Sequence, residues 1–528
     1  MWHIILAIIV IAFTAFYLRV KYKMTYWRRH RVPEDPGYFP FGSKMSLDIL
    51  RRKVPLLKSS ENLYKAFPDA AFVGTYGIFG SLSLIIRDLD LAKRVLIKDF
   101  DNFSERRPRV KAGTDRLDPH SKNNRFLAKM LIELQGDKWK RTRASLTPIF
   151  TSAKLKTMVP LIHSVANHCD NLLEKSAADK KEFEAGDVMR SLACDMIIST
   201  GFGYESNSFL DPENLFKKNA EKLSPRDATL KTIVGVLLVR TFPKIFGWFG
   251  LSVMDVDAQE FFAKAILNEI KKRKVSGEKR NDFIDIGLDI LKKDAENTSA
   301  ELVTERGETN GINQGEIEQI LIANNILMFL AGFSTVSGVT AAILYYMAKN
   351  QDYQEILYQE VKTSVDLAGG VADQLDYAAV TGMHYMEKIF QESLRMFPFS
   401  QLQRYAIADY KIPDTNIVIP KNTSVRFPAT AIVKDAKYFP KPDVFDPENF
   451  SAQNKAARHP LATGGFGHGP RNCIAQRFAT IEVKLIIARI IHKYRVLPCD
   501  QTVDQLISDP GKFFGQPKGD IWITVEKR

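Results

Sequence analysis

Hydrophobic residues crowd the first eighteen positions of the chain, MWHIILAIIVIAFTAFYL, and then give way to a basic stretch. At about 1.5 Å per residue, a helix from Trp2 to Leu18 is about 26 Å long, close to the shortest length that crosses a bilayer. Trp2 and Tyr17 stand near its two ends, where amphipathic rings prefer the membrane interface. The pattern predicts a membrane-spanning helix.

A cleaved signal peptide has a similar apolar run, but it usually carries positive charge before the run and small residues at a cleavage site. Here no Lys or Arg precedes the run, and basic residues follow it: Arg19, Lys21, Lys23, Arg28, Arg29 and Arg31. Basic residues favour the cytoplasmic side, so we expect a retained anchor with the body in the cytoplasm. Pro33, Pro36 and Pro40 then predict a stiff, non-helical connector.

Further along, hydrophobic alternation predicts a β-hairpin formed by residues 72–76 and 82–86. Apolar residues at helical spacing predict helices within Asp90–Lys98, Gly136–Phe150, Glu316–Met347 and Tyr385–Met396, and a last one running to about His492. A β-rich region is expected from Arg404 to Ile419, with a final strand at Ile521–Val525. Helices thus dominate, and strands form a smaller region.

Three segments are less regular. Residues 107–125 and 298–315 are polar and are expected to be loops. The stretch from Ile233 to Leu251 is too interrupted by charge and proline for a second span. Contact with the membrane interface and packing in the core both remain open for it.

The chain has 528 residues, 45% hydrophobic and 26% charged, and no repeat or low-complexity linker divides it. Its net charge of +13 suits nucleic acid, a membrane surface or an acidic partner. Because the basic residues are spread along the chain without a nucleic-acid module, we do not expect nucleic-acid binding. Cys169, Cys194, Cys473 and Cys499 show no disulfide or zinc spacing, which favours a reducing compartment.

Cys473 has the most informative surroundings. It follows a turn-rich loop with Gly467, Gly469 and Pro470, and it precedes the last predicted helix. Unpaired N–H groups at a helix N-terminus favour an anion, so we expect a stabilised thiolate, helped by nearby Arg471. Such a thiolate can be a nucleophile, a redox thiol or a metal ligand, whereas a buried cysteine is often an apolar filler.

Phe466, Gly469, Arg471 and Cys473 resemble the haem-binding loop of the cytochromes P450, Phe-x-x-Gly-x-Arg-x-Cys-x-Gly, with Ala475 in place of the last glycine. The resemblance implies that Cys473 is the axial ligand of haem b iron. It also implies a cytochrome P450 fold, mostly α with a smaller β-rich region and an N-terminal transmembrane anchor.

The same resemblance implies residues for the haem propionates. Trp139 and Arg143, spaced as Trp-x-x-x-Arg on one helical face, match a family pair that reaches a propionate. Arg404, on a strand after a later helix, and Arg471 would complete the set, with Arg106 as a further propionate ligand. Lys138, Lys140 and Arg141, on other faces of the same helix, match a basic surface that docks a reductase in the family, although a merely solvated face explains them equally well.

The segment AGFSTVSG resembles the oxygen-binding helix, with Ala331 and Gly332 under oxygen and Thr335 organising proton delivery. Ser334 stands where the family usually has an acid. Serine can relay a proton through water but supplies no carboxylate, so we expect slower or leakier oxygen activation.

Glu392 and Arg395 match the family's Glu-x-x-Arg pair, which braces the haem-binding core. Asn449 replaces the arginine that usually completes this network. It can hydrogen-bond but lacks the positive charge, so the expected cost falls on stability or haem retention.

Together these matches imply a microsomal P450 with an anchor at 1–20, a basic and proline-rich hinge at 21–44 and a haem domain at 45–528. It would insert one oxygen atom from O2 into a lipophilic substrate, a xenobiotic, steroid or fatty acid. Electrons would come from NADPH through NADPH–cytochrome P450 reductase, with cytochrome b5 as an optional partner, at the cytosolic face of the endoplasmic reticulum membrane. An oxygen-independent isomerase or dehydratase, favoured by Ser334, and a non-catalytic haem-bound ligand carrier are the alternatives.

Overall fold

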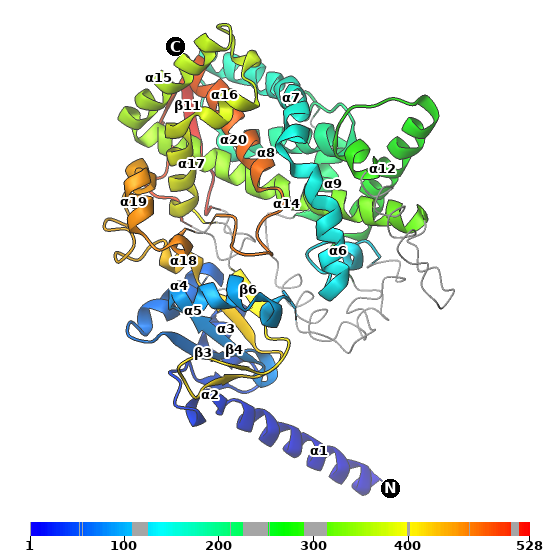
Figure 1. The fold of residues 1–528 in the computed structure, drawn as a ribbon, viewed down its shortest axis with the longest axis vertical. Coiled ribbons are helices and arrows are strands. Elements are labelled where there is room, and N and C mark those ends of the chain that lie inside the picture. Colours follow the sequence, from blue (N-terminus) through cyan, green and yellow to red (C-terminus); the bar gives the residue numbers. More distant parts are fainter. Residues whose placement is uncertain are drawn as a thin grey trace.

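The computed structural model describes residues 2–51, 53–54, 56–107, 125–211, 213–224, 252, 254–289, 314–398, 402–463, 465–507 and 517–528. The loop expected between 107 and 125, the stretch 233–251 and most of the loop 298–315 lie outside these residues. Helices form most of the described chain, and a smaller β-rich lobe lies at the end from which the N-terminal helix projects (Figure 1). The predicted fold class is confirmed.

The first helix, α1 (Trp2–Lys23), has a mean hydropathy of 2.2 and is almost wholly exposed. Its length and composition fit a membrane span. Among the described helices, α14 (Gln314–Lys349) is also long and apolar enough to cross a membrane, with a mean hydropathy of 1.9 over Glu318–Lys349. Because most of α14 is buried inside the protein, its apolar surface belongs to the core.

The β-rich lobe is built on a sheet in the order β3 (Phe72–Tyr76), β4 (Leu82–Ile86), β9 (Ser424–Phe427) and β6 (Leu402–Tyr405). The β3–β4 hairpin is antiparallel and has the predicted bounds. β4 pairs with β9 in parallel, and β9 pairs with β6 in antiparallel. The sheet therefore joins the N-terminal hairpin to strands more than 300 residues later in the chain.

Small sheets complete the strands: β1 (Gly37–Tyr38) with β2 (Gly42–Ser43), β7 (Tyr410–Lys411) with β8 (Val418–Ile419), and β10 (Tyr494–Leu497) with β11 (Trp522–Lys527) and β5 (Phe183–Glu184). The shorter helices are α2 (Tyr26–Arg29), α3 (Lys44–Leu50), α4 (Leu56–Ala66), α5 (Leu89–Lys93), α6 (Gly136–Leu146), α9 (Leu215–Leu223), α16 (Tyr377–Gly382), α18 (Ala429–Ile432) and α19 (Ala452–Ala457).

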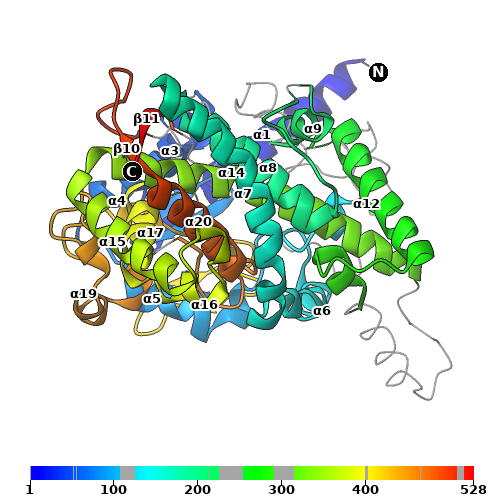
Figure 2. The same cartoon turned by 90° about the horizontal axis from the view of Figure 1, so that it is seen from above.

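The longer helices pack around α14. Seen from above, α8 (Ala185–Ile197) and α20 (Gln476–Lys493) lie against α14, with α7 (Ser152–Asp179) beside them (Figure 2). α12 (Val256–Ser276), α15 (Gln351–Leu367) and α17 (His384–Met396) also contact α14. The helix is apolar on nearly all sides, which is what a helix enclosed by neighbours requires.

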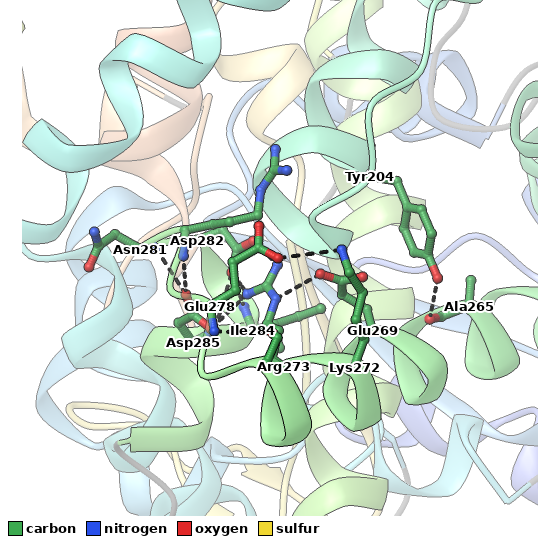
Figure 3. Close-up of polar contacts among 12 residues, drawn as sticks. Tyr204, Ala265, Glu269, Lys272, Arg273, Glu278, Asn281, Asp282, Ile284 and Asp285 are labelled. Atoms are coloured by element: carbon green, nitrogen blue, oxygen red, sulfur yellow. Dashed lines mark hydrogen bonds and ion pairs between the residues drawn. The ribbon is translucent and has the colours of Figure 1, made fainter.

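A buried charge cluster holds the C-terminal end of α12 (Figure 3). The Arg273 guanidinium donates to Glu269 at 2.8 Å, to both carboxylate oxygens of Asp282 at 2.7 and 2.6 Å, and to Asp285 at 2.7 Å. Gly203, at φ 73°, lies against this cluster, and a Cβ there would stand 2.0 Å from Arg273 Nη2. One arginine therefore joins α12, the segment after it and the turn that follows α8.

Candidate cofactor site around Cys473

The loop from Phe466 to Ala475 leads into α20 and carries Cys473. The Cys473 N–H donates to the Phe466 carbonyl at 2.9 Å, and the Phe466 ring packs on Phe390 of α17 at 6.0 Å. Gly469 adopts φ 72°, and a Cβ on it would lie 1.9 Å from the Leu96 carbonyl oxygen. Only glycine fits there, so Gly469 sets the position of the loop against residues 94–98.

The Cys473 thiol is exposed, whereas Cys169 and Cys194 are buried. Burial of the group by its surroundings raises the pKa of the Cys473 thiol, and this outweighs the Ala475 N–H and the positive charges of Arg106 and Arg143. The side chain is thus accessible to solvent, yet surrounded closely enough by protein to be partly desolvated. Burial therefore opposes the thiolate form, whereas the Ala475 N–H and the two arginines favour it.

Two of the predicted arginines are poorly satisfied, the half-buried Arg106 and the buried Arg404. Arg106 donates to the Arg471 carbonyl at 2.6 Å, and Arg404 donates to the Gln403 carbonyl at 2.9 Å. Burial and the charge of Arg106 lower the pKa of Arg404 to about 9. Burial and the charges of Arg107 and Arg143 lower the pKa of Arg106. The Nε atoms of both Arg106 and Arg404 are buried with no acceptor among the described residues. Neighbouring guanidinium groups that lower each other's pKa favour an anion between them.

The other two arginines each make several hydrogen bonds around the cysteine loop. Arg143 donates to the backbone and side-chain oxygens of Asn472 at 3.0 and 2.7 Å. Arg471 donates to the backbone carbonyls of Ser104, Leu131 and Leu134 and pairs with Glu105 at 3.4 Å. Its guanidinium also stacks on the Trp139 ring at 3.8 Å. Arg471 and Trp139 therefore clamp the cysteine loop to α6 and to the segment before it.

The electrostatics of this cluster fit an anionic cofactor beside a cysteine ligand. Burial and the charges of Arg106, Arg404 and Arg143 lower the pKa of Arg471 to about 9, and Glu105 only partly opposes this. Mutual repulsion among buried guanidinium groups falls when carboxylates bind between them. Haem carries two propionates and an iron that accepts a thiolate, so the residues fit haem.

Leu327, Ala331 and Thr335 form an accessible stripe along α14. Ala331 is exposed, and Leu327 and Thr335, each one turn away on the same face, are half-buried, although their neighbours Phe333 and Val336 are buried. The Thr335 hydroxyl donates to the Ala331 carbonyl at 2.5 Å. This stripe offers an apolar surface with a single hydroxyl.

Ser334 and Gly332 lie on other sides of α14. The buried Ser334 hydroxyl is 2.6 Å from that of Ser224, which ends α9. A Cβ on Gly332 would stand 2.8 Å from Ile197 Cδ1 of α8. The small residue at position 332 thus permits close packing of α14 on α8.

Glu392 and Arg395 form a fully buried ion pair on α17, with Nε to Oε2 and Nη2 to Oε1 both at 2.7 Å. Burial raises the pKa of Glu392, and Arg395 acts in the opposite direction. Asn449 donates to Glu392 at 3.1 Å. Arg458 donates to the Asn449 carbonyl at 3.0 Å, and its positive charge acts on Glu392. Arg458 thus supplies charge near the position where the family usually has an arginine.

Comparison with known proteins decides the family. The cytochrome P450 family model matches residues 74–524. The chain belongs to the cytochrome P450 family. It is similar to cytochrome P450 6B7 of Helicoverpa armigera, with 31% identity over 532 residues that cover 100% of this chain and 99% of that protein.

Cytochrome P450 6a2 of Drosophila melanogaster is 32% identical, and the match covers 95% of each chain. Cytochrome P450 6A1 of Musca domestica is 29% identical, over 98% of this chain and 96% of that protein. Membership makes this P450 a haem monooxygenase that works with O2, a substrate and a redox partner. The family assignment and the enzyme class predicted from sequence are confirmed.

Sequence reasoning missed three residues of this P450 site. Glu105 pairs with Arg471, Asn472 accepts from Arg143, and Arg458 lies beside the Glu392 network. Asn472 stands next to Cys473, so its place in the loop was visible in the sequence. Glu105 and Arg458 carried no local signal, because their partners are far along the chain or outside the family motif.

Proposed function

We propose that this P450 uses haem b to insert one oxygen atom of O2 into a lipophilic organic substrate, a xenobiotic, steroid or fatty acid, with electrons drawn from NADPH through a reductase. The observation that carries the proposal is the accessible Cys473 thiol beside a cluster of poorly neutralised buried arginines. The similarity to cytochromes P450 6B7 and 6a2 supports the microsomal type.

Cys473 would be the axial ligand, and Arg106 and Arg404 would bind the propionates, because the charge of Arg106 acts on both Arg404 and Cys473. Arg143, Arg471, Trp139 and Phe466 would hold the loop that presents Cys473. Haem, when bound, supplies one-electron and O2 chemistry, and a thiolate ligand favours O–O cleavage.

Thr335 would organise proton delivery, because its hydroxyl is the polar group on the accessible stripe of α14. Leu327 and Ala331 on the same stripe offer apolar contact, which suits a lipophilic substrate. The Ser334 hydroxyl is hydrogen-bonded to that of Ser224 on another face of α14, so its role would be structural. Thr335 would then lack the acidic residue that usually precedes it in the family.

The proposed reductase contact is the face beside α6. Lys138, Lys140 and Arg141 are exposed there, next to an open groove of about 550 Å³ lined by Ile97, Trp139 and Pro470 among others. Pro470 belongs to the cysteine loop, so a partner on this face would lie close to the proposed ligand. A basic surface favours an acidic partner such as a flavoprotein.

The proposed location is the endoplasmic reticulum membrane, with α1 as a single-pass anchor and the haem domain on the cytosolic face. The apolar, exposed α1 and the basic residues after it support this orientation. The boundaries proposed for the segments are 1–20, 21–44 and 45–528.

The test is the absorbance spectrum of the reduced protein with carbon monoxide, for the wild type and for Cys473→Ala. A far-red-shifted Soret band in the wild type alone supports thiolate-ligated haem. A protein that binds haem without this band in fresh preparations contradicts the role of Cys473. Substrate-dependent NADPH use with a reductase then separates the monooxygenase from an oxygen-independent isomerase or a ligand carrier, neither of which consumes NADPH.

A further inference from the structure

One face of the sheet in the β-rich lobe carries polar side chains. Arg426 of β9 pairs with Gln403 of β6, and residues that pair directly share a face. Ser424 and Tyr405 form the next pair on this face, because side chains alternate along a strand. By the same alternation, Arg404 belongs to the opposite face. The polar face therefore holds Gln403, Tyr405, Ser424 and Arg426, here named the polar quartet.

The polar quartet is rich in hydrogen-bond donors. The Gln403 side-chain amide donates to the Ser424 hydroxyl at 2.7 Å and to the Tyr405 hydroxyl at 3.1 Å. Each hydroxyl oxygen accepts this bond, so its own O–H is still available to donate. Arg426 adds the N–H groups of a guanidinium, which donate and cannot accept. The quartet thus offers several donors on one side of the sheet.

Arg426 has neither a hydrogen-bond acceptor nor a carboxylate partner in the part of the chain that the structure describes. Its side chain is half-buried, and burial lowers the pKa of Arg426, although the Tyr405 phenol acts in the opposite direction. Elsewhere in this protein, Arg273, Arg395 and Arg489 are buried with a carboxylate at 2.6 to 2.7 Å. A guanidinium that is partly withdrawn from water needs such an anion, so Arg426 is the exception that calls for one.

The surrounding sheet does not supply this anion. Its four strands contain no Asp or Glu. Across the sheet, Thr75 of β3 pairs with Ser83 of β4, and Ser83 pairs with Ser424. The Thr75 and Ser83 hydroxyls are buried without a hydrogen-bond partner among the described residues. A row of hydroxyls therefore runs from β3 to β6 next to Arg426, with donors in excess of acceptors.

We propose that the polar quartet binds the carboxylate of a lipophilic acid, such as a fatty acid, and so selects this class among the substrates of the proposed monooxygenase. The inference rests on the proposed function and names its substrate class. One carboxylate matches the charge of one guanidinium, and its two oxygens suit the paired N–H groups of Arg426. A phosphate monoester carries nearly two charges at neutral pH, which one arginine does not balance.

The polar quartet lies close to the proposed haem site through β6. The Tyr405 N–H donates to the Glu105 carbonyl at 2.8 Å, and the Glu105 side chain pairs with Arg471 of the cysteine loop. β6 is an edge strand, on the side of the lobe that faces the helices (Figure 1). Because Arg426 is on the face away from Arg404, the carboxyl end of a bound acid is kept from the haem site. Oxidation is therefore expected at carbons remote from the carboxylate.

The experiment measures binding to the full-length holoenzyme in phosphatidylcholine nanodiscs by equilibrium dialysis, with empty nanodiscs as the reference for partition into lipid. The probes are radiolabelled dodecanoate, dodecanol and acetate at about pH 8, where carboxylic acids are ionised. The variants are Arg426→Met, which removes the charge, and Arg426→Lys, which keeps it. The matched control is Lys421→Met, which removes an exposed cation just before β9.

We expect Arg426→Met to weaken dodecanoate binding by about 10- to 100-fold, the factor that corresponds to a lost charge-assisted hydrogen bond. Dodecanol has no charge, so its binding should be unchanged in every variant. Arg426→Lys should recover part of the dodecanoate affinity, and Lys421→Met should retain all of it. Arg426→Met should also unfold at no lower temperature than the wild type without ligand, because it removes a charge that has no partner.

Equal affinity of the wild type for dodecanoate and dodecanol overturns the proposal, as does unchanged dodecanoate binding in Arg426→Met. Acetate that binds as tightly as dodecanoate indicates a site for small anions and overturns the assignment to a lipophilic acid. If dodecanoate binds as expected and no substrate supports NADPH use with a reductase, the carboxylate site is supported and the proposed function is contradicted.

Discussion

Replacement of Arg273 by methionine tests the buried cluster at the end of α12 (Figure 3). Methionine keeps much of the length of the side chain and removes the charge. Four contacts of 2.6 to 2.8 Å to Glu269, Asp282 and Asp285 are lost. Because Asp282 and Glu269 are almost fully buried, water cannot replace the guanidinium.

Removal of one partner from a buried ion pair typically costs about 3 to 5 kcal/mol, since the remaining charge stays buried. Here three carboxylates lose their cation, so we expect the upper part of that range at neutral pH. Lys274→Met is the matched control. Lys274 is the next residue of α12, and it is considerably exposed and pairs with Glu318 at 2.5 Å. Exposed pairs of this kind contribute about 0 to 1 kcal/mol.

The pH dependence has a definite sign. Burial raises the pKa of Asp282, and pairing with Arg273 acts in the opposite direction. Without Arg273, this opposing effect is lost, so the pKa of Asp282 rises further. A carboxyl with a raised folded pKa binds more protons in the folded state, so stability falls as pH rises through that pKa. The loss in Arg273→Met should therefore be smaller at about pH 5 than at about pH 8.

The assay is urea unfolding of the wild type and of both variants, followed by far-UV circular dichroism at the two pH values. Comparison at a fixed pH isolates the effect of each substitution on the free energy of unfolding. If Arg273→Met differs from Lys274→Met by less than about 1 kcal/mol at the higher pH, the cluster does not stabilise the fold as argued.

Three further predictions concern single residues. Gly469→Ala combines a strained φ of 72° with a Cβ 1.9 Å from the Leu96 carbonyl oxygen, so it should lower the free energy of unfolding by about 3 kcal/mol or more. The control, Gly277→Ala, has φ 70° with no atom within 4 Å, and it should cost only about 1 to 2 kcal/mol in the same unfolding assay. Burial raises the pKa of Glu482 to about 8, so ionisation destabilises the fold as pH rises through that value. Glu482→Gln should therefore gain stability relative to the wild type on going from acid to alkaline pH, and a pH-independent difference contradicts this. Arg404→Met should stabilise the haem-free protein, because a buried charge without an Nε acceptor is removed, and should speed haem loss, measured by transfer to apomyoglobin. Slower or unchanged haem loss contradicts the proposed propionate contact.

Local elements were predictable because their signals lie within a few residues. The hairpin at 72–76 and 82–86 has the predicted bounds, since alternation and two glycines specify it locally. The helix expected over Gly136–Phe150 stops as α6 at Leu146 and continues as a 3-10 turn from Thr147 to Phe150. Pro148 accounts for the change, because its ring clashes with the preceding helical turn and it cannot donate to the ladder.

Contacts between distant segments were not predictable. The sequence indicated that Ser334 and Gly332 were unusual in a buried helix, but not that Ser224 and Ile197 meet them. The position of a residue along a helix shows which neighbour it contacts only once the surrounding elements have been placed. Arg458 illustrates the same limit, because it comes near Glu392 from 66 residues later in the chain, where no motif marks it.

The ionisation of Cys473 depends both on its local sequence and on distant residues that the fold brings close to it. The sequence assigned the stabilisation of a thiolate to a helix N-terminus and to Arg471. In the fold, α20 begins only at Gln476, and Arg471 turns away to backbone carbonyls and Trp139. The cations that act on the sulfur are Arg106 and Arg143, which are more than 300 residues earlier, and burial outweighs them. Since coordination to a metal ion deprotonates a thiol outright, haem binding and ionisation of Cys473 would be a single coupled event.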